Sequence, residues 1–151
     1  MADDGPSGGD EATVASNRAV VTRLWAALYD RHDFDEVGSL FAPDGFYCDM
    51  PNPAQGATGP AEVAARLRLG LGRLRAHTHD IERMVAEGDT VVTEHVEHWV
   101  FPTGETVSLP FVSVHRLERG RVVLWRDYWN WNTLMEGVPP WWLEEIAAGY
   151  R

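Results

Sequence analysis

The feature that most constrains this chain is a change of hydrophobic period at Ala76, from helical spacing to an alternation of two. Residues 76–86, 90–101, 105–116 and 121–131 alternate and are rich in β-branched and aromatic residues, which favour strands. Only short turns separate these runs, each containing a glycine: Gly88, Gly104 and Gly120. Connections of this length predict an antiparallel meander of four strands.

Before Ala76 apolar residues recur with a helical period, and Asp33 and Glu36 have the spacing of a capping box. The predicted helices cover 16–31, 34–41, 60–74 and, near the C-terminus, 143–148, and a short strand covers 46–50. Residues 1–15 are rich in Gly, Asp and Ser, so we expect a disordered leader before a single domain, 16–151. The pattern predicts an α+β fold in which a cone-shaped, curved antiparallel sheet packs against three N-terminal helices.

Composition excludes several classes of function. The net charge of −10 argues against nucleic acid as a partner, because phosphates require a basic surface. The single cysteine, Cys48, allows no intramolecular disulfide and is typical of a reducing compartment. No signal peptide or apolar stretch of membrane-spanning length is present, so we expect a cytoplasmic protein without a membrane partner.

The last predicted strand contains Trp125-Arg126-Asp127, and successive side chains of a strand point to opposite faces. Asp127 therefore shares a face with Trp125, Trp129 and Trp131. Burial among indoles raises the pKa of a carboxyl group, as a general base in an apolar pocket requires. The alternative is a structural Asp that caps the strand end or pairs with Arg126 or Arg121.

The same alternation of side chains between the two faces of a strand places other polar residues beside Asp127. His95, Glu97 and Trp99 share one face of the second strand, and Tyr47 and Asp49 share a face of the short early strand. If these faces are buried, the carboxyl groups cannot all ionise, and at least one keeps a proton at pH 7. The alternative is an ordinary amphipathic strand with His95 and Glu97 in solvent.

Two further features have a simpler explanation than chemistry. His77 and His79 have metal-ligand spacing, but no acid follows at a suitable interval, so we expect no metal. Cys48 lies between Tyr47 and Asp49 and so points away from them, as a buried thiol rather than a nucleophile.

Four segments resemble limonene-1,2-epoxide hydrolases of the nuclear transport factor 2-like (cystatin-like) superfamily, which also holds ketosteroid isomerases, scytalone dehydratases and SnoaL-type polyketide cyclases. They are Tyr47-Cys-Asp49-Met-Pro51, Thr93-Glu-His95-Val-Glu97, Pro102-Thr-Gly104 and Trp125-Arg-Asp127-Tyr128. In that family a Tyr, an Asn and an Asp hold a water, the Asp deprotonates it, and a second Asp, bridged through an Arg, protonates the epoxide. The resemblance implies that Asp127 activates water, Tyr47 holds it and Glu97 donates the proton.

The chain departs from the family pattern at two positions. Asp49 stands in place of the Asn and can imitate it only as a neutral acid, and His95 stands in place of the Arg and can bridge the acids only when protonated. The resemblance further implies a homodimer and a cofactor-independent pocket for a small hydrophobic substrate. The expected lining residues are Trp99, Leu109, Phe111, Trp129 and Trp131.

The favoured function is therefore hydrolysis of an apolar epoxide to a diol. An isomerase, cyclase or dehydratase would use the same Asp127 to remove a carbon-bound proton, with Tyr47 or Glu97 stabilising the oxyanion. A domain that only binds a hydrophobic ligand or mediates dimerisation is the non-catalytic alternative, because fold does not imply function.

Overall fold

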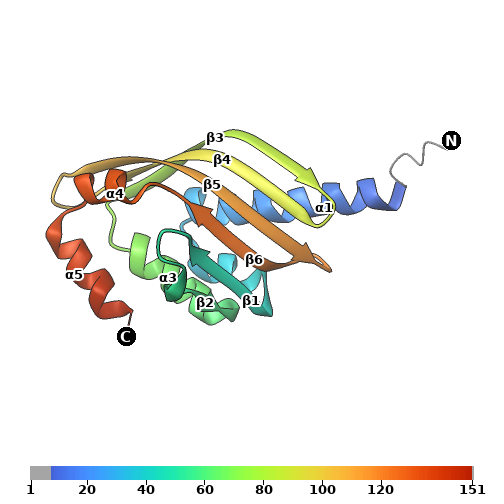
Figure 1. The fold of residues 1–151 in the computed structure, drawn as a ribbon, viewed down its shortest axis with the longest axis horizontal. Helices are drawn as coiled ribbons and strands as arrows, with labels where there is room; N and C mark the ends of the chain where they lie inside the picture. Colours follow the sequence, from blue (N-terminus) through green and yellow to red (C-terminus); the bar gives the residue numbers. More distant parts are fainter. Residues whose placement is uncertain (1–7, 151) are drawn as a thin grey trace.

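A computed structural model describes residues 8–150 and shows one curved sheet of six strands, with helices against it (Figure 1). The strands are β1 (Phe41–Asp49), β2 (Ala57–Thr58), β3 (Ala76–Glu87), β4 (Thr90–Val100), β5 (Thr106–Glu118) and β6 (Arg121–Tyr128). Their order across the sheet is β2-β1-β6-β5-β4-β3. Strands β3 to β6 pair antiparallel with their neighbours in sequence, which confirms the predicted meander.

Strand β1 joins the other side of β6 in parallel orientation, which the sequence did not predict. It is also longer than the predicted strand over 46–50, with an irregular register between Phe41 and Phe46. The pairing places Tyr47 opposite Trp125 and Asp49 opposite Asp127. Two carboxyl residues far apart in sequence thus become neighbours across two strands.

The N-terminal helices are α1 (Gly8–Trp25), α2 (Phe34–Ser39) and α3 (Gly59–Leu71). Helix α1 contacts β3 and β4, and α3 contacts β1, so the helices cover one face of the sheet as predicted. The Asp33 carboxylate accepts a hydrogen bond from the Glu36 backbone N–H at 2.9 Å, which confirms Asp33 as the cap of α2.

The predicted start of the first helix was wrong. Helix α1 begins at Gly8 rather than at Ser16, so residues 8–15 of the expected leader are helical, and residues 1–7 lie outside the described part. The last turn of the same helix widens into a π-helical segment, Ala26–Asp30, of the kind found often at functional sites.

The C-terminal part also differs from the prediction. Strand β6 ends at Tyr128, and Trp131 begins helix α4 (Trp131–Gly137) instead of ending a strand. The reason is local, because the Asn130 side chain accepts a hydrogen bond from the Thr133 N–H at 3.1 Å and so caps the helix. The predicted short C-terminal helix exists as the longer α5 (Pro140–Gly149).

The alternation of burial along β4 decides which face points inward. His95, Glu97 and Trp99 are buried, whereas His98 on the other face is partly exposed. The inward orientation of His95 and Glu97 is thereby confirmed, and the solvent-facing alternative is excluded.

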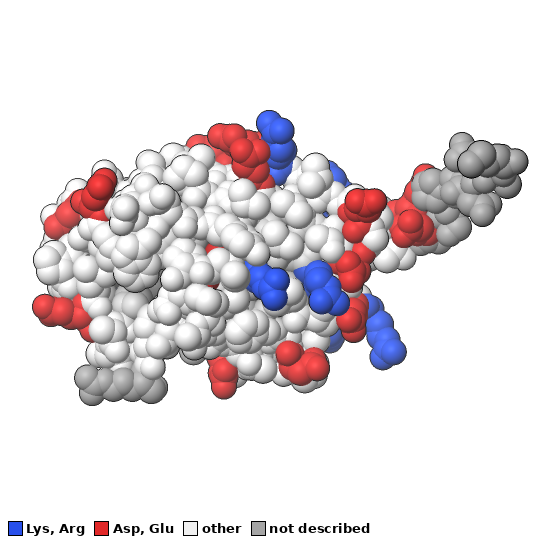
Figure 2. Space-filling model, viewed as in Figure 1, with Lys and Arg blue, Asp and Glu red and all other residues white. Residues whose placement is uncertain are grey.

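Charged groups do not gather into a basic surface on the side of the molecule shown in Figure 2. Acidic residues are scattered over it, with arginines between them. Within residues 8–150, no helix is long and apolar enough to cross a membrane.

Candidate active site

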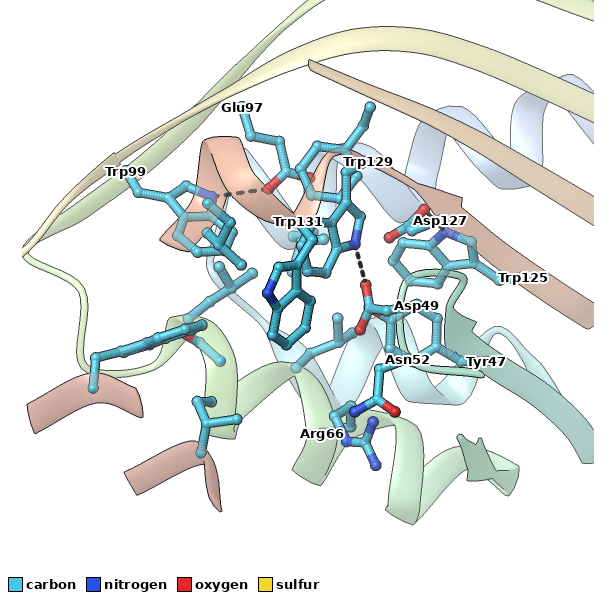
Figure 3. Close-up of a pocket in the computed structure, with 18 of the residues that line it drawn as sticks. Tyr47, Asp49, Asn52, Arg66, Glu97, Trp99, Trp125, Asp127, Trp129 and Trp131 are labelled. Atoms are coloured by element: carbon cyan, nitrogen blue, oxygen red, sulfur yellow. Dashed lines mark hydrogen bonds between the residues drawn. The ribbon is translucent and has the colours of Figure 1, made fainter. Parts of the chain in front are cut away.

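A cavity of about 130 Å³ lies between the inner face of the sheet and the helices α3 and α5 (Figure 3). Its size is comparable to cavities that hold a small aromatic ring. Four of the five predicted substrate-side residues line it: Trp99, Phe111, Trp129 and Trp131. Leu109 does not. Leu109 is fully buried in the core on β5, against which α4 packs. Its side chain points inward but does not reach the cavity.

Asp127 is 3% exposed and borders the cavity from β6. Its Oδ1 accepts hydrogen bonds from the Ser113 hydroxyl and the Trp125 indole N–H, both at 2.5 Å. Burial raises the pKa of Asp127 well above its ordinary value, and the charges of Asp49 and Glu97 add to the rise. These partners, rather than Arg126 or Arg121, hold the side chain, so the alternative of a structural ion pair is wrong.

Asp49 lies beside Asp127 in the sheet register. Its carboxylate accepts hydrogen bonds from Trp129 Nε1 at 2.8 Å and from the Tyr47 hydroxyl at 3.2 Å. Burial raises the pKa of Asp49, whereas these two donors and the charge of Arg66 oppose the rise. The charge of Asp49 contributes to the raised pKa of Asp127, and we call these two adjacent carboxyl groups the dyad.

Glu97 reaches the cavity from β4 and is 4% exposed. Its Oε2 accepts a hydrogen bond from Trp99 Nε1 at 2.8 Å. Burial raises the pKa of Glu97 from 4.5 to about 7, although the Tyr29 hydroxyl and the Trp99 indole work in the opposite direction. Glu97 can therefore both hold and release a proton near neutral pH.

His95 does not bridge the acids, which corrects the expectation drawn from the family pattern. It is 1% exposed, and its Nε2 and Nδ1 contact Ser113 Oγ at 2.9 Å and His79 Nδ1 at 3.3 Å. Burial, and secondarily His79, lowers the pKa of His95 to about 3. The ring lies 4.8 Å from that of Trp25 in α1, so removal from water outweighs the attraction of the nearby acids.

Several residues that line the cavity were not predicted from the sequence. Tyr29, in the π-helical segment, borders the cavity, and its buried hydroxyl makes no hydrogen bond of ordinary geometry to a described residue. Asn52 and Arg66 lie beside Asp49 (Figure 3). The Arg66 guanidinium donates to the Gln55 carbonyl and lies 4.2 Å from the ring centre of Tyr150. Tyr29 was hidden in the apolar stripe of a helix, and no local signal distinguishes Arg66 from other helical arginines.

Cys48 and the histidines of β3 pack against neighbouring residues in the fold. Cys48 is buried, and its burial raises the pKa of the thiol. His77 Nε2 lies 3.0 Å from the Leu28 carbonyl oxygen, and His79 stacks on Tyr29 with ring centres 3.9 Å apart. Among the described residues, no group of three or more His, Cys, Asp or Glu side chains is arranged to hold a metal ion.

The curved sheet closed by helices over a cavity is the fold of the nuclear transport factor 2-like class of proteins. Residues 21–125 match the model of the SnoaL-like domain, so the chain belongs to this family. No protein of curated function matches it.

Solved structures extend the likeness over most of the chain. An LEH-like epoxide hydrolase of M. tuberculosis is 25% identical with a TM-score of 0.70, covering 89% of this chain and 95% of that one. A putative SnoaL-like polyketide cyclase from Jannaschia sp. is 21% identical with a TM-score of 0.73, over 93% of this chain and 100% of its own. A second putative SnoaL-like cyclase, from Shewanella putrefaciens, is 19% identical with a TM-score of 0.71, over 80% and 93% of the two chains.

Proposed function

We propose that this protein hydrolyses a small apolar epoxide to a diol, without a cofactor. The observation that carries the proposal is the dyad of Asp49 and Asp127, in register on β1 and β6, in one aromatic cavity with Glu97. A dyad that shares one proton keeps one negative charge and can accept a proton from water. Glu97, with a pKa of about 7, supplies a proton from another wall of the cavity. The similarity to the LEH-like epoxide hydrolase of M. tuberculosis supports this assignment.

The reaction requires one group that accepts a proton from water and one group that donates a proton to the epoxide oxygen. Tyr47 and the dyad position a water molecule, and the dyad takes one of its protons while the water oxygen bonds to an epoxide carbon. The carbon–oxygen bond of the ring breaks, and the leaving oxygen takes the proton of Glu97. When the diol leaves, the dyad gives up one proton and Glu97 regains one, directly or through solvent, which restores the starting state.

Incubation with cyclohexene oxide and its methyl-substituted relatives in ¹⁸O-labelled water tests the proposal. We expect a diol that contains one labelled oxygen, because the attacking atom comes from water. Epoxide consumption without label in the product, or no consumption of any member of the series, contradicts hydrolysis.

The buried hydroxyl of Tyr29, which acts on Glu97 at the cavity, favours a second candidate, an isomerase or cyclase. A phenol and a protonated Glu97 in one dry cavity are suitable donors to a developing enolate oxygen, while the dyad removes a carbon-bound proton. Exchange of α-hydrogens of cyclic ketones in D₂O, without incorporation of solvent oxygen into a diol, distinguishes this reaction from hydrolysis.

We further propose a homodimer through the outer face of the sheet. Val85, Val112 and Tyr128 on this face are 55%, 39% and 42% exposed. Apolar side chains grouped on one face are typical of an interface. Sedimentation analysis of the full chain is expected to give twice the monomer mass, and substitution of Val112 by Asp to give the monomer.

A further inference from the structure

A continuous row of hydrogen bonds leads from Asp127 away from the cavity into the core. The Ser113 hydroxyl lies 2.5 Å from Asp127 Oδ1, His95 Nε2 lies 2.9 Å from Ser113 Oγ, and His79 Nδ1 lies 3.3 Å from His95 Nδ1. Ser113 and His95 are 0% and 1% exposed, whereas His79 on β3 is only half-buried. Neither Ser113 nor His95 borders the cavity.

We propose that Ser113, His95 and His79 form a proton relay along the inner face of the sheet that connects Asp127 to solvent at β3 rather than through the cavity. In the first hydrogen arrangement His79 Nδ1–H donates to His95 Nδ1, His95 Nε2–H donates to Ser113 Oγ, and the Ser113 O–H donates to Asp127. In the second arrangement every donor is reversed, and Asp127 carries a proton on Oδ1. Both arrangements fit the same heavy-atom positions.

The two arrangements differ by one proton. When His79 Nε2 gains a proton from solvent, His79 Nδ1 passes one to His95 Nδ1, His95 Nε2 passes one to Ser113, and Ser113 passes one to Asp127 Oδ1. Each N–H or O–H bond that breaks is replaced by one on the next atom. The reverse sequence returns the dyad's proton to solvent, and Glu97 regains its own proton from solvent when the diol leaves. The relay can therefore reset the dyad while product still fills the cavity.

Neutral imidazoles suit this role. Burial lowers the pKa values of His79 and His95 to about 4 and about 3, so neither ring holds a charge that would trap the moving proton. His79 is partly exposed, and its Nε2 makes no hydrogen bond to a described residue, so this atom is where the relay would reach water. The titratable groups around the row are Tyr29, Asp30 and Asp80 near His79, His115 near His95, and Asp49 and Glu97 near Asp127.

The outer face of the same strands provides a matched control. His98 Nδ1 lies 2.9 Å from Ser108 Oγ, and His98 Nε2 lies 2.9 Å from Asp80 Oδ2. The same three residue types lie here in an exposed position away from the cavity, with the histidine rather than the serine in the middle.

The first test requires no substrate. In protein labelled with ¹⁵N at histidine and ¹³C at aspartate carboxyl groups, we expect His95 to change from the Nε2–H to the Nδ1–H tautomer at the same pH at which Asp127 becomes protonated. In Asp127→Asn the His95 tautomer should stay Nε2–H throughout, and in His98→Gln the coupled change should persist. A His95 tautomer that stays constant through the Asp127 titration of the wild-type protein overturns the relay.

The second test rests on the proposed function, because it measures turnover. At low buffer concentration His79→Asn, which keeps a donor near His95 but cannot pass a proton, should lower the steady-state rate about tenfold, less than the 10²- to 10⁴-fold expected for loss of an essential base. Imidazole buffer should restore most of this rate without changing KM, and Ser108→Ala and His98→Gln should behave as wild type. A rate that is unchanged in His79→Asn, or lowered without response to imidazole, overturns the relay. Absence of all epoxide turnover contradicts the proposed function alone, because the tautomer test then still decides on the relay.

Discussion

Strands β4 and β5 carry a histidine and a serine on each of their two faces, and a neighbouring strand adds an aspartate to each pair. Only one of the two sets is buried. The inner trio is Ser113, His95 and Asp127, and the outer trio is Ser108, His98 and Asp80. The serine–histidine distance is 2.9 Å in both. The inner residues are at most 3% exposed, whereas the side chains of His98 and Asp80 are 39% and 80% exposed.

The difference is one of solvent rather than of residue type. Exposed ion pairs contribute little, because water screens them and the side chains lose freedom when they pair. In the inner trio, removal from water raises the pKa of Asp127 and lowers that of His95, so burial favours the uncharged form of each group. The same residue types therefore have shifted pKa values when they are buried.

The largest expected difference between the trios concerns their aspartates. Asp127→Asn should reduce epoxide turnover by about 10²-fold or more, because an essential proton acceptor is lost. Asp80→Asn should leave kcat/KM unchanged. Circular dichroism would establish that both variants are folded, and an Asp127→Asn variant within a few-fold of wild type would remove Asp127 from the reaction.

The two glutamates of β4 give the next comparison, in stability against pH. Because the pKa of Glu97 is raised from 4.5 to about 7, its contribution to stability is complete below pH 4.5 and is lost as the pH rises through 7. At about 1.4 kcal/mol for each pKa unit, Glu97→Gln should gain about 3 kcal/mol of unfolding free energy relative to wild type between pH 4.5 and pH 8.

Glu94→Gln is the control for this experiment. Glu94 forms an exposed ion pair with Arg83 at 2.9 Å, so its substitution should change stability by about 1 kcal/mol or less. Urea denaturation at a series of pH values measures both variants. Parallel curves for Glu97→Gln and wild type would contradict a raised pKa for Glu97.

The serines differ by a smaller amount. Ser113→Ala leaves the buried His95 and Asp127 without their shared partner and should cost about 1–3 kcal/mol. Ser108→Ala should stay within about 0.5 kcal/mol of wild type, as exposed substitutions do. Equal losses for the two variants, measured by chemical denaturation, would show that burial does not distinguish the trios.

The smallest effect on activity is expected for Asp49→Asn, which removes a like charge beside Asp127. The pKa of Asp127 should fall, because a like charge has gone, and Asp127 alone should then act as the base. We expect epoxide turnover within about tenfold of wild type and an acidic limb of the pH–rate profile shifted to lower pH. A loss of several orders of magnitude in a folded variant would instead favour the isomerase or cyclase, with Asp49 as the essential base.

The sequence by itself determined the features that depend on local spacing. The meander of β3 to β6, the cap at Asp33 and the shared face of His95, Glu97 and Trp99 all follow from period, turns and side-chain direction. The common face of Tyr47 and Asp49 belongs with them, since their hydrogen bond spans only two residues of one strand. The resemblance to epoxide hydrolases also correctly indicated the fold.

Only the tertiary structure decided which groups meet and which are charged. The parallel pairing of β1 with β6 brings Asp49 to Asp127, and helix α1 encloses His95 beside Trp25. No local pattern contains these contacts, because they join segments separated by dozens of residues. The pKa of each group depends in turn on how completely those segments exclude water, so a histidine that the sequence suggested as a cationic bridge is held neutral by the fold.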